Sequence, residues 1–183
     1  MAVPLTQTEK CETLAVVDDS FGAESQEREM VTGYLDWYRA IVGRKVEGLS
    51  LADASRQLTP SGLSLLGVVK HLGWVEYYWF RYVFAGEDIE PPPRVDDDNA
   101  VQFRIEPGDT VDSVLAFYVG QTEQARRITS AATSLDDLGH RHARLMGVVS
   151  LRWILLHMVE ETARHVGHLD LMRETIDGKT GYF

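Results

Sequence analysis

The chain has 183 residues, of which 44% are hydrophobic and 25% are charged, and this composition is ordinary for one globular domain. It excludes a disordered, a collagen-like and a disulfide-stapled chain. The formal net charge of −10 argues against binding to nucleic acid or to an anionic membrane surface, since both need a basic face.

Cysteine content and hydropathy indicate the compartment. The single cysteine, Cys11, cannot form an internal disulfide, which fits a reducing environment. No apolar run approaches the roughly 20 residues that a membrane helix needs. The N-terminus shows no basic start followed by an apolar block, so we expect no signal peptide. These features together predict a cytoplasmic protein.

The first helix is predicted after a lead-in. Residues 1–23 show weak hydrophobic periodicity and predict an extended or partly ordered segment, followed by one domain over 24–183. From the start of that domain, apolar residues recur at spacings of three and four, which predicts an amphipathic helix over 24–47. Three charged residues should lie off its apolar stripe: Asp36, Arg39 and Lys45.

A connection and a second helix follow. Ser50 and Asp53 have the spacing of a capping box, which predicts a short helix in the connection. Ser61 is the expected N-cap of a helix over 62–85, and Gly86 is its expected stop. This helix is apolar on most sides, so it should be central in the fold.

Residues 87–109 should form a long acidic loop rather than a helix, because they contain three consecutive prolines and a run of aspartates. A loop of this length is unusual inside a compact domain and is often functional. Asp109 or Thr110 then caps a third predicted helix, which runs to about Ala132.

The last elements complete the fold class. Residues 133–149 read as a loop, and a fourth helix is expected over 150–177 with Gly178 at its end. Four long helices without a strand signal predict an all-α four-helix bundle. Parallel neighbours in such a bundle need a long crossover, and residues 87–109 can supply one.

The fourth helix carries a polar stripe on a face that otherwise looks buried. At 100° per residue, four polar residues fall within an arc of about 80°; they are His157, Glu161, His165 and His168. Burying such groups without partners is costly. A divalent metal ion is an economical partner, since neutral imidazole and carboxylate are common ligands of first-row metals.

Spacing indicates which of these residues share an ion. Residues four apart on a helix point the same way, so Glu161 and His165 can reach one ion. The third ligand must come from a neighbouring helix. His71 is the best candidate because it lies in the most apolar helix, with Trp74 one turn further along. Three protein ligands leave open coordination positions, which is typical of a catalytic metal site.

A structural interpretation of the same residues stays open. A buried histidine usually hydrogen-bonds to a carbonyl or a carboxylate, so His157 would pair with Glu160 or Glu161 and His71 would be a core residue. Two further histidines lie beside arginines in the last loop, where we expect them to be solvated: His140 and His142.

Three segments resemble the DinB superfamily, and most closely its actinobacterial DUF664 branch of the mini-circle-protein type. They are EREMVTGYLDWYRAIVGRKVEGL, LSLLGVVKHLGWVEYYWF and LRWILLHMVEETARHVGHLDLMRETIDG, so the resemblance extends over roughly residues 24–183. It implies a DinB-like bundle that holds a metal with one ligand from the second helix and two from the fourth.

The resemblance carries over to named residues. His71 matches the second-helix ligand, while Glu161 and His165 match a pair that is His-x-x-x-His in many members. The mycothiol-dependent maleylpyruvate isomerase branch has Glu at the first of these positions, so the change keeps a ligand. His168 falls where many members carry Gln. The remaining candidates for the pocket or for support of the ligands are His157, Glu160, His168 and Trp74.

The resemblance also implies a chemistry, S-transfer or isomerisation that depends on mycothiol or bacillithiol. The metal, zinc by default with nickel or iron as alternatives, would bind the thiol of the cofactor and favour its thiolate, which would attack a small-molecule electrophile. Because Cys11 lies in the lead-in, the nucleophile need not come from the protein. No residue is assigned a direct catalytic role.

Two other functions remain open. The first is a non-catalytic, metal- or small-molecule-binding stress-response protein that uses the acidic loop at 87–98 as its contact surface. The second is a metal-dependent hydrolase in which metal-bound water attacks and Glu160 or His157 acts as the base.

The aromatic run over residues 77–80, Tyr-Tyr-Trp-Phe, bears on assembly. Four consecutive rings on one helix cannot all face its own core, so a homodimer is expected unless some rings line the pocket.

Overall fold

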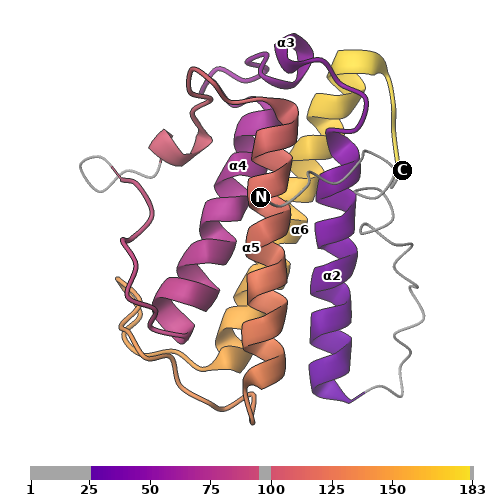
Figure 1. The fold of residues 1–183 in the computed structure, drawn as a ribbon. Helices are drawn as coiled ribbons and strands as arrows, with labels where there is room; N and C mark the ends of the chain where they lie inside the picture. Colours follow the sequence, from indigo (N-terminus) through magenta and orange to yellow (C-terminus); the bar gives the residue numbers. More distant parts are fainter. Residues whose placement is uncertain (1–25, 95–99, 182–183) are drawn as a thin grey trace, which may run out of the picture.

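Four long helical segments form where the sequence predicts them, in a computed structural model that describes residues 26–94 and 100–181 (Figure 1). The described residues hold helices and two isolated β-bridges but no strand, so the predicted all-α bundle is confirmed. The predicted lead-in over 1–23, with Cys11, and residues 95–99 of the acidic loop lie outside the described residues.

The helices have the following bounds. The α-helices are α2 Glu27–Lys45, α3 Leu51–Ala54, α4 Leu65–Glu76, α5 Val111–Ala131 and α6 Leu151–Asp177. A π-helix, η1 Tyr77–Phe84, continues α4, and a 3₁₀ turn, η2 Ala100–Phe103, lies within the predicted acidic loop. No described helix is long and apolar enough to cross a membrane.

The chain order produces two pairs of parallel neighbours. Figure 1 shows α2 and α6 running in one direction, and α4 and α5 running side by side in the other. The connection from η1 to α5 therefore returns along the whole length of the bundle, which is the crossover that the sequence predicts. The return path lays η2 against α4, and this packing places loop residues beside the buried face of that helix.

Most helix ends follow the predicted caps. The Oγ of Ser50 accepts a hydrogen bond from the backbone N–H of Asp53 at 3.1 Å, and Thr110 begins α5 with a capping box. Helix α6 ends at Gly178, whose φ of 76° lies in the left-handed region that favours glycine.

The start of α4 differs from its prediction. The helix begins at Leu65 and is capped by Ser64, not by Ser61. The reason is a turn over 58–63, in which the backbone N–H of Leu58 donates to the carbonyl of Leu63 at 2.9 Å and Gly62 has a φ of 81°. A residue with that φ cannot belong to an α-helix.

The end of this helix also differs from its prediction, because residues 77–84 form a π-helix rather than more α-helix. Its last carbonyls bind the loop that precedes α6: the carbonyls of Val83 and Phe84 accept from the backbone N–H groups of Arg141 and His140 at 3.0 and 3.1 Å. At Gly86, with φ 63°, an added Cβ would lie 2.6 Å from the Cβ of His140, so the close approach of this loop requires glycine.

Two charged residues expected off the apolar stripe of α2 are buried instead. Arg39 is 4% exposed and donates to both carboxylate oxygens of Glu76, at 2.7 and 2.6 Å. Lys45 is fully buried and pairs with Asp170 of α6 at 2.8 Å. Periodicity alone could not show this, because each charge pairs with a residue on another helix.

The aromatic run is accommodated within its own chain. Trp79 and Phe80 are buried, the hydroxyl of Tyr77 donates to the carbonyl of Glu90 at 2.7 Å, and Tyr78 lines a cavity. The homodimer stays a prediction, and this run no longer argues for it.

Candidate metal centre and its cavity

The three predicted ligands meet between α4 and α6. One carboxylate oxygen of Glu161, Oε1, lies 3.4 Å from Nε2 of His71 and 3.3 Å from Nε2 of His165. One ligand atom from each residue can be chosen so that all three lie within 4.8 Å of one another. His71 and His165 are buried, and Glu161 is partly buried. The structure thus brings together side chains that are ninety residues apart in the sequence.

Local sequence explains the convergence. Glu161 and His165 are one turn apart on α6 and point the same way. His71 lies in the central, apolar part of α4, which packs along α6. Gly67, one turn before His71, has the carbonyl oxygen of Phe103 against it: a Cβ there would lie only 2.4 Å from that oxygen. The glycine therefore lets η2 approach the three-residue cluster.

Two residues of η2 that the sequence did not indicate contact His71. Oε1 of Gln102 lies 3.2 Å from Nδ1 of His71, and the amide nitrogen of Gln102 donates to the carbonyl of Pro93 at 3.1 Å. The ring of Phe103 stacks on that of His71, with centroids 3.9 Å apart. The sequence holds only a slight signal for these residues, an uncharged amide and an aromatic ring inside an otherwise acidic loop.

Gln102 determines which nitrogen of His71 is free. Because the amide nitrogen of Gln102 is used by Pro93, its oxygen faces Nδ1 and accepts the proton held there. Nε2 then presents a lone pair toward the carboxylate of Glu161. Such a second partner is what orients a metal-ligating histidine and fixes its tautomer.

The charges of the three side chains suit a cation. The imidazoles of His165 and His71 beside it, His165 first, hold the pKa of Glu161 well below its usual range, so Glu161 is a carboxylate near neutral pH. Burial lowers the pKa of His71 from its ordinary 6.5, so its ring is neutral under the same conditions. A carboxylate and a neutral imidazole are the ionisation states that metal ligands need.

The distances also fit an ion. Separations of 3.3 and 3.4 Å are long for hydrogen bonds, which are about 2.7–3.2 Å. Two ligand atoms bound to a tetrahedral ion at about 2.0–2.1 Å lie about 3.3–3.4 Å apart. The donor types and their spacing therefore fit a divalent cation.

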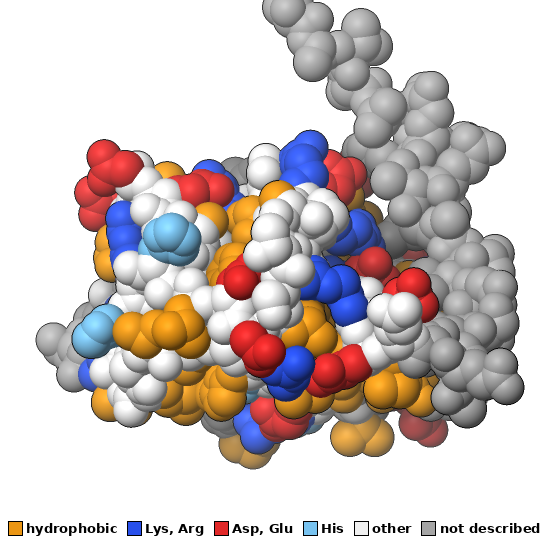
Figure 2. Space-filling view, turned by 90° about the horizontal axis from the view of Figure 1, so that it is seen from below, with side chains coloured by type: hydrophobic (Ala, Val, Ile, Leu, Met, Phe, Trp, Pro, Cys, Tyr) orange, Lys and Arg blue, Asp and Glu red, His pale blue; other side chains and the backbone are white. Residues whose placement is uncertain are grey.

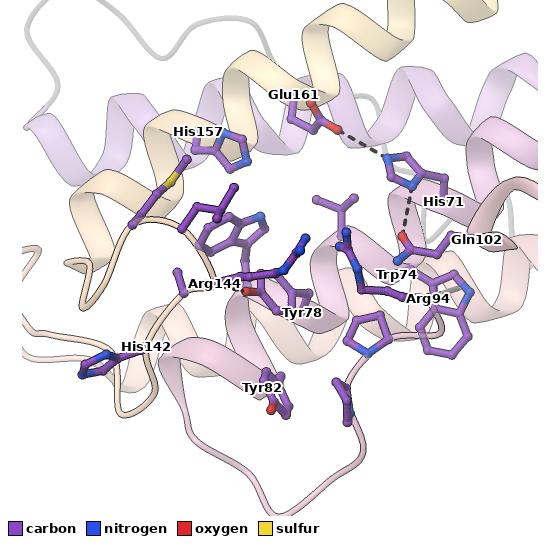
Figure 3. Close-up of a pocket in the computed structure, with 17 residues that line it drawn as sticks. His71, Trp74, Tyr78, Tyr82, Arg94, Gln102, His142, Arg144, His157 and Glu161 are labelled. Atoms are coloured by element: carbon purple, nitrogen blue, oxygen red, sulfur yellow. Dashed lines mark hydrogen bonds and ion pairs between the residues drawn. The ribbon is translucent and has the colours of Figure 1, made fainter. Parts of the chain in front are cut away.

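A cavity of about 560 Å³ opens beside this cluster, with His71 and Glu161 in its wall (Figure 3). Its other walls are largely aromatic, and four of its rings come from α4 and η1: Trp74, Tyr78, Trp79 and Tyr82. The loop before α6 and the segment of prolines at 91–92 close the remaining sides. The cluster therefore has access to a space that can hold a small molecule.

The other candidate residues occupy different places. Trp74 and His157 line the cavity. His157 stacks on Trp153 with centroids 5.1 Å apart, and its Nδ1 lies 3.7 Å from a carboxylate oxygen of Glu160. Glu160 itself is exposed, is not among the described residues that line the cavity, and pairs with Arg164 at 2.9 Å.

His168 lies behind the cluster rather than in the cavity. Its Nδ1 is 3.4 Å from Nδ1 of His165, so it contacts the nitrogen that faces away from Glu161. The pKa of His168 is lowered, chiefly because the ring is partly buried and also because His165 lies beside it.

The two loop histidines differ from each other. Both are exposed, as expected, but His142 also lines the mouth of the cavity, whereas His140 does not. Figure 2 views the end of the bundle that carries this loop and shows histidine side chains at the surface beside hydrophobic ones. Sequence position alone could not distinguish them, because the two are only two residues apart in one loop.

Comparison with known proteins agrees with this geometry. Residues 30–178 match the family described as Mycothiol-S-transferase. No curated protein matches the chain. The family match spans α4, α5 and α6 entirely, together with most of α2, and it includes His71, Glu161 and His165. The chain belongs to the mycothiol S-transferase family.

Proposed function

We propose that this chain is a metal-dependent S-transferase that uses a low-molecular-weight thiol of the mycothiol type to attack an electrophilic small molecule. The observation that carries the proposal is the meeting of His71, Glu161 and His165 beside a 560 Å³ cavity, with His71 and Glu161 in its wall. Membership of the family supports the choice of thiol.

His71, Glu161 and His165 would hold the ion. Zinc is the first expectation and nickel or iron are the alternatives, because a set of imidazole and carboxylate ligands does not select among them. A divalent ion bound there would lower the pKa of a coordinated thiol and so favour the thiolate.

The remaining residues of the cavity prepare the reaction. Gln102 keeps the Nδ1 proton of His71 in place, which leaves Nε2 unprotonated. The rings of Trp74 and Tyr78 limit access of water to the cavity. We expect His157, one turn before Glu161 on α6 and in the cavity wall, to accept the proton of the incoming thiol.

The nucleophilic sulfur comes from the small molecule. The sequence has one cysteine, which lies outside the described residues, so no described residue offers a thiol to the cavity. In the transfer, a carbon–sulfur bond forms, the leaving group departs with the electron pair of its bond, and the thiol proton goes to His157 or to solvent.

The test measures thiol consumption with chlorodinitrobenzene as a neutral electrophile, with and without mycothiol, before and after removal of metal by a chelator. We expect turnover that needs both the metal and the thiol, and that returns when zinc is added back. His140→Ala serves as the matched control, since His140 is exposed and outside the cavity.

Two results would contradict the proposal. Turnover of an ester or amide without added thiol would point to a hydrolase. Tight metal binding without thiol transfer across a panel of electrophiles would point to a binding protein.

A further inference from the structure

Tyr78 is a polar side chain of the cavity wall that the function proposed above uses only as a ring. It lies two turns after His71 on the continuous segment formed by α4 and η1. At about 100° per residue, that spacing puts the two side chains on the same face of the helix. Both line the cavity, and Figure 3 shows Tyr78 across it from His157 and Glu161.

Neighbouring side chains fix the direction of the Tyr78 hydroxyl. The Tyr78 ring stacks on that of Tyr82, with centroids 5.9 Å apart, and meets that of Trp79 in a T-shaped contact at 5.0 Å. The guanidinium of Arg141 lies 4.4 Å from the ring centroid of Tyr82 and donates to the carbonyl of Glu87 at 2.7 Å, so the stack is itself anchored. A ring held by such contacts presents its hydroxyl at one place.

The hydroxyl of Tyr78 is engaged only as an acceptor. The backbone N–H of Arg144 donates to it at 3.2 Å, and a peptide N–H cannot reverse that role. The proton of the hydroxyl therefore needs an acceptor of its own. Within residues 26–94 and 100–181, no oxygen or nitrogen accepts that proton. Because Tyr78 lines the cavity, a molecule bound there can accept it.

Two neighbouring tyrosines differ from Tyr78 in this respect. The hydroxyl of Tyr77 donates to the carbonyl of Glu90 at 2.7 Å, and Tyr77 is not among the described residues that line the cavity. Tyr82 lines the cavity, but it lies one turn further from His71, and among the described residues no hydrogen bond holds its hydroxyl. Tyr78 thus combines an oriented hydroxyl with an unused proton.

The spacing along the helix decides which part of an electrophile the hydroxyl contacts. Tyr78 and His71 are roughly 10 Å apart along the helix axis, so the hydroxyl suits an acceptor across a planar body from the attacked carbon. The walls between them include Trp74 and Trp79, which suit an aromatic body. When a thiolate adds to an aromatic ring, negative charge is delocalised onto a conjugated acceptor para to the attacked carbon. A donor held at that acceptor stabilises the charge.

We propose that Tyr78 donates a hydrogen bond to a carbonyl or nitro oxygen of the electrophile. The electrophile is then a planar, conjugated molecule that carries this oxygen across its body from the carbon that sulfur attacks. The inference rests on the proposed function for the identity of the reaction, but the hydrogen bond forms on binding and does not require turnover.

A matched pair of electrophiles tests the hydrogen bond. Para-chloro-meta-nitroacetophenone has a carbonyl group para to the carbon that bears chlorine, and para-chloro-meta-nitrobenzotrifluoride has a trifluoromethyl group, a much weaker acceptor, at that position. In both, the thiolate sulfur bonds to the carbon that bears chlorine, chloride leaves with the electron pair of the broken bond, and the thiol proton goes to His157 or to solvent. We expect Tyr78→Phe to lower kcat/KM for the ketone by roughly tenfold or more, and for the trifluoromethyl compound by less than about twofold.

The pair also separates hydrogen bonding from a structural effect. Phenylalanine keeps the ring but releases the N–H of Arg144, and a displaced loop would slow both electrophiles alike. Tyr77→Phe is the matched control on the adjacent residue, whose proton is already bound to Glu90, and it should keep the wild-type ratio of the two rates. Equal losses for both electrophiles in Tyr78→Phe, or a ketone-selective loss in Tyr82→Phe instead, would overturn the assignment.

Infrared spectroscopy of a bound ketone separates this inference from the function. Meta-nitroacetophenone lacks the leaving group, so it can bind to the metal-free protein without reacting. A carbonyl that accepts a hydrogen bond stretches at a lower frequency, so the bound carbonyl should have a lower frequency in the wild type and in Tyr77→Phe than in Tyr78→Phe. That difference supports the hydrogen bond even if no thiol transfer occurs. The same frequency for the bound ketone in all three proteins would overturn it.

Discussion

Helix α4 carries two buried ionisable side chains five residues apart, His71 and Glu76, and their surroundings differ sharply. Glu76 faces α2, where both of its oxygens accept from Arg39 at 2.7 and 2.6 Å. His71 faces α6, where Glu161 Oε1 lies 3.4 Å away. Glu76 is therefore paired with Arg39 at hydrogen-bonding distance. The facing atoms of His71 and Glu161 are further apart, at a separation that fits two ligands of one cation.

This difference in contact geometry distinguishes a buried charge that stabilises the fold from one that is suited to bind a ligand. A buried ion pair with short, bidentate geometry needs nothing further. A carboxylate flanked by two imidazoles at 3.3 and 3.4 Å, in the wall of a cavity, has the spacing of a group that could hold a cation. Burial alone does not separate the two cases, since Glu76 is more deeply buried than His71.

The largest expected effect is a loss of stability when the buried ion pair between Arg39 and Glu76 is broken. Glu76→Ala leaves the guanidinium of Arg39 buried without its main partner, so the free energy of unfolding should fall by about 3–5 kcal/mol. Urea unfolding measures this loss, and metal content should stay unchanged in the folded variant. Glu160→Ala is the control, because Glu160 is exposed and its ion pair with Arg164 should contribute at most about 1 kcal/mol. If Glu76→Ala and Glu160→Ala lowered the free energy of unfolding equally, the buried ion pair would stabilise the fold no more than the exposed one.

At the candidate metal centre we expect the main effect of a substitution to be on metal binding. His165→Ala should weaken metal binding by about 100-fold, which corresponds to about 2.7 kcal/mol. His140→Ala should leave metal binding as it is, since His140 lies outside the cavity. Elemental analysis and calorimetric titration give occupancy and affinity. Equal metal occupancy in both variants would refute the assignment of ligands.

A smaller effect should come from the residue that orients His71. Gln102→Leu removes the acceptor at Nδ1 and should weaken metal binding about tenfold, or about 1.4 kcal/mol. Gln57→Leu, at an exposed amide in a turn, is the matched control. If the Gln102 variant binds metal as the wild type does, the amide has no part in setting the tautomer.

The smallest effect is a pH dependence of the metal-free protein. Because burial lowers the pKa of His71 below its ordinary 6.5, the unfolded chain binds a proton there at a higher pH than the folded chain. The stability from a neutral His71 is present above pH 6.5 and is lost as the pH falls below that value. Between about pH 7.5 and 5.5 we therefore expect the free energy of unfolding to fall.

His71→Phe keeps a ring against Phe103 and removes the titrating group. Its urea unfolding should depend less on pH over the same window than that of the wild type. A steeper dependence in the variant would show that another group controls the acid response.

The fold and the three candidate ligands could be predicted from sequence because they depend on local rules. The spacing of Glu161 and His165 places them on one helix face, and the apolar surroundings of His71 place it at the centre of the bundle. The caps at Ser50 and Thr110 follow from side chains within three residues of the helix start.

Features that depend on distant partners could not be predicted. Gln102 reaches His71 only because the crossover returns along α4, and nothing near Gln102 in the sequence indicates this path. Arg39 looked like a surface residue because its partner, Glu76, lies on another helix. The π-helix was also missed, since η1 is rich in large apolar side chains that pack in either type of helix.

The crossover between η1 and α5 has a consequence for how this bundle can diverge during evolution. The candidate ion-binding residues lie on α4 and α6, whereas Gln102 and Arg94 belong to a connection that must span the bundle but lies outside the four long helices. The entropy cost of closing a loop rises slowly with its length, so insertions and replacements there leave the helices stable. Descendants of this fold should therefore exchange substrates by rewriting this one connection while inheriting the metal ligands unchanged.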